Sequence, residues 1–200
     1  MKVREIFTLG IVLMVYSVAA CVGLAFVYSG TKETIAQRTQ ADLEAALKEL
    51  FPGADDFEEI SGAAVSPDPG VSFEKEYAVR QGGRLVGAAL RARGGSYGGP
   101  IIVLVGVNAG GTISRIKIME HTDTPGLGAN AASGDYFIDQ DGTTTFYGQF
   151  TGKAAADPFE VKDDVAALTA ATITSRAVAR VVKASADAAL EWLGKNGGIQ

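Results

Sequence analysis

The chain is organised around one stretch near its C-terminus, Leu168-Thr169-Ala170-Ala171-Thr172-Ile173-Thr174-Ser175. Its hydroxyl residues are too dense for a strand in a core, but they suit the start of a helix. A Thr or Ser at such a start can cap the free N–H groups of the first turn. Those N–H groups and the helix dipole also attract anions. The stretch therefore predicts a helix start at which an anionic group can bind.

The helix that follows is predicted to run from about Ile173 to Leu193. Apolar and small residues recur there at three- and four-residue spacing, which places them on one face: Val178, Val181, Val182, Ser185, Ala189 and Trp192. Glycines at 194, 197 and 198 are expected to end it. The pattern predicts a C-terminal helix packed by one face against the rest of a domain.

The middle of the chain reads as strands joined by glycine-rich turns. The expected strands are Phe73–Val79, Leu85–Leu90, Ile101–Val107 and Ile113–Met119. In the last of them alternation predicts a buried face formed by Ile116 and Ile118. A helix is expected over residues 34–50, and the acidic and Ser/Gly/Pro-rich residues 55–70 are expected to form a connection. The predicted fold class is α+β, with an antiparallel-rich sheet packed by the C-terminal helix.

The N-terminal segment predicts a membrane anchor. Residues 6–31 carry no charge, and Ile6 to Tyr28 is mostly apolar. As a helix this apolar part is about 35 Å long, enough to cross the hydrocarbon core of a bilayer. Lys2 and Arg4 precede it and favour an N-terminus in the cytoplasm. We therefore expect an anchor over residues 1–31 and an extracytoplasmic domain over residues 32–200.

A lipoprotein signal is the alternative for this segment. Val18-Ala19-Ala20-Cys21 resembles a bacterial lipobox, in which the cysteine becomes a lipidated N-terminus after cleavage. The apolar run continues after Cys21, whereas lipoproteins usually turn polar there. The sequence favours the uncleaved anchor.

The composition limits the partners and cofactors that this chain can have. The formal net charge is -5, and no basic stripe is present, which argues against nucleic acid as a partner. One cysteine and one histidine cannot supply an intrachain disulfide, a Cys-based zinc site, a Cys-ligated iron–sulfur cluster or an all-histidine metal site. We therefore expect no metal site. Any redox chemistry must come from a cofactor that needs no thiolate, and flavin fits.

Three segments together resemble the covalent FMN-binding domains. Residues 169–175, Thr-Ala-Ala-Thr-Ile-Thr-Ser, resemble the family motif Ser/Thr-Gly-Ala-Thr-x-Thr-Ser. His121-Thr122-Asp123-Thr124-Pro125-Gly126-Leu127-Gly128 resembles the family loop His-x-Glu-Thr-Pro-Gly-Leu-Gly, and Tyr97-Gly98-Gly99-Pro100-Ile101 resembles a third segment. The wider resemblance is to the G subunit of Rnf-type ion-translocating electron-transport complexes, and next to the C subunit of the sodium-pumping NADH:quinone reductase. It covers about Phe51 to Val182.

The resemblance implies a site and a function. In the family a flavin transferase joins the FMN phosphate to the last Thr of the tetrad, which corresponds to Thr172. It implies no catalytic side chain and these cofactor-binding residues: Thr172, Thr169, Ala170, Ala171, His121, Thr124, Gly126, Leu127, Gly128 and Arg176. The implied function is electron carriage by FMN in a membrane complex that links ferredoxin and NAD to movement of Na⁺ or H⁺. Other subunits, membrane lipid and the flavin transferase are the implied partners.

Chemistry supports several of these assignments. Glycines at 126 and 128 let the backbone approach a flat ring, and Thr124 can hydrogen-bond a flavin carbonyl or ring nitrogen. His121 is a candidate donor to the reduced ring, or a surface residue of a turn-rich loop. Arg176 is either a counter-ion for phosphate or an exposed cation.

Two departures from the family keep a rival open. The tetrad has Gly where this chain has Ala170, and the transferase signature has Asp where this chain has Ala166. Ala fits position 170 only if φ is negative there. The rival is a membrane-anchored sensory or binding domain without covalent flavin. A hydrolase triad of Ser175, His121 and Asp123 is disfavoured, because the chain has no Gly-x-Ser-x-Gly elbow.

Overall fold

The structure is a computed structural model that describes residues 3–60, 62 and 64–197. The chain forms two compact units, Met1–Ala45 and Ala46–Gln200. The boundary between these units falls inside the first helix. The second unit contains the sheet, the C-terminal helix and every segment of the candidate site.

The N-terminal helix α1 spans Val3–Leu50 without interruption. The sequence predicts an apolar span and a separate helix over residues 34–50, whereas the structure joins them. Gly30 lies between them, but no proline breaks the segment, and the Thr31 hydroxyl bonds back to the Val27 carbonyl at 2.8 Å. The helix is long and apolar enough to cross a membrane. Large apolar side chains such as Leu13, Leu24 and Phe26 are exposed along it, which suits contact with lipid.

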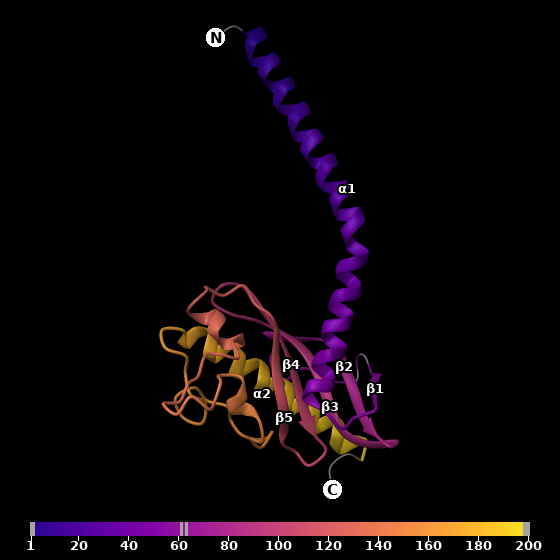
Figure 1. Ribbon diagram of the computed structural model, residues 1–200, viewed down its shortest axis with the longest axis vertical. Helices are drawn as coiled ribbons and strands as arrows, with labels where there is room; N and C mark the ends of the chain where they lie inside the picture. Colours follow the sequence, from indigo (N-terminus) through magenta and orange to yellow (C-terminus); the bar gives the residue numbers. More distant parts are fainter. Residues whose placement is uncertain (1–2, 61, 63, 198–200) are drawn as a thin grey trace. The chain divides into compact units, whose positions relative to one another are not determined.

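Five antiparallel strands form a meander in chain order (Figure 1). They are β1 (Asp56–Glu59), β2 (Val71–Gln81), β3 (Arg84–Gly95), β4 (Pro100–Asn108) and β5 (Ile113–Glu120). The four predicted strands are confirmed. The short edge strand β1 lies in the stretch predicted to be a connection. Its acidic sequence carries no strand pattern, and it is held by pairing with β2, where Glu58 meets Arg80 and Glu59 meets Lys75.

The C-terminal helix α2 (Thr172–Lys195) lies against one face of the sheet, as predicted (Figure 1). Its buried residues share a core with Ile101, Val103, Val105 and Val107 of β4. Successive residues of a strand point to opposite faces. Ile102 and Leu104 are therefore on the second face and are also buried. Phe51 fills that second face, because its ring occupies the space above Gly87 and Gly106.

Strand β5 departs from the predicted alternation at Ser114. Gly106 pairs with Arg115 and Val107 with Ile113, so Ser114 is an extra residue opposite that step. Such a bulge resets the alternation, and Ile113 is buried together with Ile116 and Ile118. The Ser114 hydroxyl donates to the Leu50 carbonyl at 2.5 Å. The predicted buried face of Ile116 and Ile118 was therefore incomplete.

The 51-residue connection between β5 and α2 is mostly irregular and is coloured orange in Figure 1. It contains two short 3₁₀ helices, η1 (Gly128–Ala132) and η2 (Gly148–Phe150). Three buried phenylalanines anchor it in the core: Phe146, Phe150 and Phe159. The ring centroid of Phe150 lies 5.9 Å from that of Phe146 and 5.8 Å from that of Phe159. This anchoring holds the middle of the connection in the core, and its two ends carry the loop after β5 and the turn before α2.

Candidate functional site

A cavity of about 450 Å³ lies at the start of α2. All three segments singled out in the sequence line it: Tyr97, Thr124, Leu127, Gly128, Ala170, Ala171, Thr172, Ile173 and Thr174. Its volume is in the range of ordinary small-molecule sites. Segments that are far apart in the chain therefore build one site, in which the β3–β4 turn, the loop after β5 and the first turn of α2 meet.

Asp123 holds two of these segments together. Its carboxylate is 5% exposed and accepts hydrogen bonds from the Ser96 hydroxyl and the Gly98 N–H, both at 2.6 Å. Thr122 adds a bond from its hydroxyl to the Gly98 carbonyl at 3.0 Å. These contacts fix the β3–β4 turn and hold Tyr97 at the rim of the cavity. In the sequence Asp123 stands where the family has Glu, and the residue pattern gave no sign that it joins two segments.

Gly128 joins the loop after β5 to α2. A Cβ at this buried position would lie 2.5 Å from the Thr174 hydroxyl and 2.8 Å from the Asp123 Cβ. The close approach therefore requires glycine. At Gly126 an added Cβ would meet open space, so crowding does not require glycine there. The requirement comes from the backbone, because φ is 77°.

Helix α2 begins without the predicted hydroxyl cap. Its N-cap residue is Ala171, and within the described part of the chain no side chain caps that end. The first bond of the helix runs from the Ser175 N–H to the Ala171 carbonyl at 3.0 Å. The N–H groups of Thr172, Ile173 and Thr174 precede that bond and are available to an anion at the cavity.

Ala170 has a φ of 58°, in the left-handed region. It is the third residue of a turn closed by the Ala171 N–H and the Leu168 carbonyl at 3.2 Å. Turns with positive φ at this position favour Gly, the residue found in the family motif. Ala was expected to fit position 170 only if φ were negative there, and the observed φ is positive. Left-handed backbone costs a residue with a Cβ about 1–2 kcal/mol.

Ala170→Gly is accordingly expected to stabilise the chain. The relief of about 1–2 kcal/mol exceeds the about 0.4–1 kcal/mol that Gly costs through the greater freedom of the unfolded chain. The net gain is about 0.5–1 kcal/mol, or about 1–4 °C in Tm. Thermal unfolding of the detergent-solubilised chain measures it. An unchanged or lower Tm would contradict the strain assigned to Ala170.

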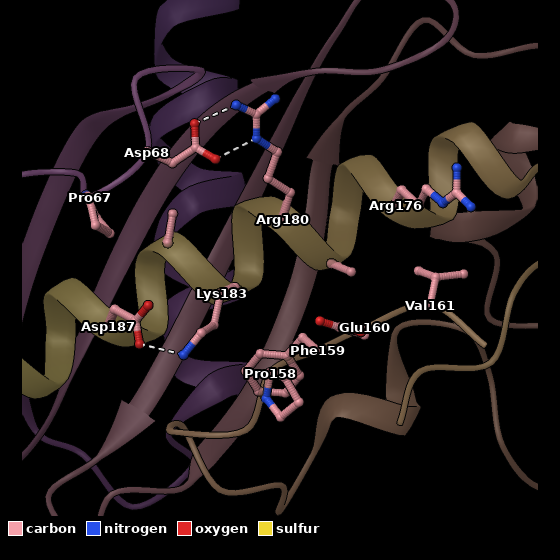
Figure 2. A pocket seen from close by; sticks show the side chains of 12 residues that line it. Pro67, Asp68, Pro158, Phe159, Glu160, Val161, Arg176, Arg180, Lys183 and Asp187 are labelled. Carbon is pink, nitrogen blue, oxygen red and sulfur yellow. Dashed lines mark hydrogen bonds and ion pairs between the residues drawn. The ribbon is translucent and has the colours of Figure 1, made fainter. Parts of the chain in front are cut away.

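Two expected site residues lie in other depressions. His121 is exposed and lines a depression of about 370 Å³ with Arg93, Met119 and Glu120. Arg176 lies at one end of a groove of about 550 Å³ between α2 and residues 158–161, near Val161 (Figure 2). Thr169 and Gly126 are exposed and contribute no lining to the 450 Å³ cavity.

The groove holds its own ion pairs. Figure 2 shows Arg180 bonded to Asp68 and Lys183 bonded to Asp187, the latter at 2.7 Å. The hydrogen bond from Arg180 and that from the Gly70 N–H hold the pKa of Asp68 below its usual value. Because each of these two cations is paired with a carboxylate, the groove attracts an anion less strongly than its number of cations suggests.

The hydrolase arrangement is excluded by geometry. The Ser175 hydroxyl is buried and bonded to Leu168 and Ala171. Asp123 is bonded to Ser96 and Gly98, and His121 lies in a different depression. Within residues 3–60, 62 and 64–197, His, Cys, Asp and Glu form no group that could hold a metal ion.

The cavity residues fit FMN. Every lining residue is uncharged, with apolar surface from Tyr97, Leu127 and Ile173 suited to a flat aromatic ring. Thr124, Thr172 and Thr174 add hydroxyls, and the open helix start suits a phosphate. Gly128 lines the cavity without a side chain of its own.

Comparison with known proteins agrees with this arrangement. Residues 96–187 match the FMN-binding domain, and residues 1–50 match the RnfG N-terminal region. The chain is 31% identical to the G subunit of the Na⁺-translocating ferredoxin:NAD⁺ oxidoreductase complex of Acetobacterium woodii, over 91% of this chain and 90% of that protein. It is 31% identical to the G subunit of the ion-translocating oxidoreductase complex of Methanosarcina acetivorans, over 92% and 94%. The corresponding protein of Escherichia coli O157:H7 is 29% identical, over 87% and 86%. The chain therefore belongs to the G-subunit family of ion-translocating oxidoreductase complexes.

Proposed function

We propose that this chain is the electron-carrying flavoprotein subunit of a membrane complex that couples electron transfer between ferredoxin and NAD to translocation of Na⁺ or H⁺. FMN is attached to Thr172 through a phosphoester. The observation that carries the proposal is the position of Thr172, at the open start of α2 and in the wall of a cavity built from three family segments. Relatives named for ferredoxin:NAD⁺ oxidoreduction, one Na⁺-translocating and one proton-translocating, support the reaction class.

Each part of the cavity has a role in this proposal. FMN supplies the one- and two-electron chemistry when bound. In the attachment step the Thr172 oxygen would displace a nucleoside monophosphate from the FMN phosphorus of a flavin dinucleotide supplied to the transferase. The hydroxyl proton would leave with that phosphate. The N–H groups of the first turn would then hold the phosphate oxygens. Tyr97, Leu127 and Ile173 would supply the apolar surface against which the ring packs. Thr124 donates or accepts a hydrogen bond at the ring edge.

In-gel fluorescence tests the cofactor directly. The full chain is co-expressed with a flavin transferase, denatured and separated, so that only covalently held flavin stays with the band. A fluorescent band supports the proposal. A dark band supports the second candidate, a membrane-anchored binding or sensory domain without covalent flavin. The left-handed Ala170 and the Ala166 that replaces the family's Asp are the observations that favour that candidate.

The proposed placement in the membrane is single-pass, with the FMN-binding domain on the extracytoplasmic side. The long exposed apolar part of α1 supports a span, and Lys2 and Arg4 support a cytoplasmic N-terminus. A covalent tether suits a compartment in which lost FMN is not easily replaced. A reporter fused after Gln200 is expected to work only if it is one that functions outside the cytoplasm. Activity of a cytoplasm-specific reporter would contradict this orientation.

Thr124 and His121 are expected to differ in their influence on the flavin. Thr124 lines the cavity, whereas His121 lines the neighbouring depression. A hydrogen bond to the ring changes the relative stability of its oxidised and reduced forms. A redox titration is therefore expected to show a larger shift of midpoint potential for Thr124→Val than for His121→Ala. A larger shift for His121→Ala would assign the hydrogen bond to the histidine instead.

A further inference from the structure

Ser175 makes an unusual set of contacts beside the attachment residue. Its side chain is 0% exposed. Its hydroxyl accepts a hydrogen bond from the Leu168 N–H at 2.9 Å and donates one to the Ala171 carbonyl at 3.0 Å. One side chain therefore joins both ends of the turn that contains Ala170. We refer to these two hydrogen bonds as the Ser175 clasp.

The turn needs such a clasp because Ala170 is left-handed. A residue with a Cβ keeps a strained conformation only where its surroundings leave no alternative. The direct turn bond from Ala171 to Leu168 is long, at 3.2 Å. Return of Ala170 to negative φ would rotate the adjoining peptide groups and displace Ala171, the residue immediately before Thr172. The geometry of the attachment residue therefore depends on the turn.

We propose that Ser175 is a positioning residue for covalent attachment at Thr172: its clasp holds Ala170 left-handed and so presents the Thr172 hydroxyl at the cavity. The inference rests on the proposed function, because it concerns the step that attaches FMN. Ser175 does not react itself, since its hydroxyl is enclosed and committed to backbone groups on both sides.

The test is a coupling between two positions. The full chain is co-expressed with a flavin transferase, and the rate of FMN incorporation is followed by in-gel fluorescence and intact mass. Ser175→Ala removes both bonds and leaves the buried Leu168 N–H without its acceptor. We expect incorporation to slow about tenfold. Adding Ala170→Gly is expected to restore the rate to within about twofold, because Gly takes the left-handed φ without a clasp.

A matched control comes from the same helix. Ser185 is also fully buried, and within the described residues its hydroxyl has no hydrogen-bond partner. Ser185→Ala is expected to incorporate FMN at the unmutated rate. Rates are compared at a temperature at which circular dichroism shows each variant folded, so that a change in stability alone does not alter them. If Ser175→Ala fails to fold, the rate of FMN incorporation is compared between Ala170→Gly alone and the double variant. We expect these two rates to agree within about twofold.

The outcomes separate the two proposals. An unmutated rate for Ser175→Ala, or a double variant that stays tenfold slow, overturns the role of Ser175 and leaves FMN attachment intact. FMN missing from every chain, the unmutated one included, overturns the proposed function and this inference with it. Slow Ser175→Ala with rescue by Ala170→Gly supports both.

Discussion

Thr172→Ala is expected to remove all covalent FMN from the chain, while Thr174→Ala retains it. Alanine has no oxygen that can form the phosphoester. Thr172 is half-buried and lines the cavity at the first residue of α2. Thr174 is buried, and its hydroxyl faces Gly128 so closely that an added Cβ there would lie 2.5 Å away. In-gel fluorescence of the denatured chain reads the result.

Two further variants sharpen this comparison. Thr172→Ser is expected to keep part of the FMN, because the hydroxyl is preserved. Thr169→Ala controls for the exposed threonine at the start of the turn and is expected to keep the full amount. Fluorescence that survives in Thr172→Ala and disappears in Thr169→Ala would move the attachment site to residue 169.

Gly98→Ala is expected to cause the second large effect, a loss of about 3 kcal/mol of stability. The new Cβ would overlap the Thr122 carbonyl oxygen and lie 2.8 Å from the Asp123 Cα. Both neighbours are backbone atoms and cannot rotate away. The turn must move, which breaks the bond from the Gly98 N–H to Asp123 and displaces Tyr97 from the cavity rim. Tm is expected to fall by about 6–12 °C.

Gly95→Ala is the matched control for that substitution. Gly95 is close to the same β3–β4 turn, its added Cβ meets open space, and its φ is not positive. Its Tm is expected to stay close to the unmutated value. Equal losses for Gly95→Ala and Gly98→Ala would show that general flexibility of the turn, and not the close approach to Thr122, sets the stability.

Much of the fold follows from local patterns. The four predicted strands and α2 were recognisable because each buries at least one face and carries its own apolar periodicity. Strand β1 was not, since its acidic residues gain strand structure only by pairing with β2. The bulge at Ser114 was equally hidden, because it depends on the register with β4 and on the Leu50 carbonyl.

The candidate site was predictable in its segments but not in its contacts. Resemblance of three motifs singled out the segments that line the cavity. Tyr97, Ile173 and Thr174 were absent from the expected binding residues, although each lies in a quoted motif. The clasp of Ser175 and the left-handed Ala170 are properties of tertiary bonding and backbone conformation, which no residue pattern displays.

The central claim is that Thr172 carries FMN, and mass spectrometry of the full chain co-expressed with a flavin transferase tests it most directly. The account predicts an intact mass raised by one FMN less one water. Fragmentation of the peptide spanning Leu168–Arg176 is expected to place that mass on Thr172. An unmodified chain would contradict the electron-carrier function and favour the flavin-free domain. FMN on another residue would preserve the function and refute the assignment of Thr172.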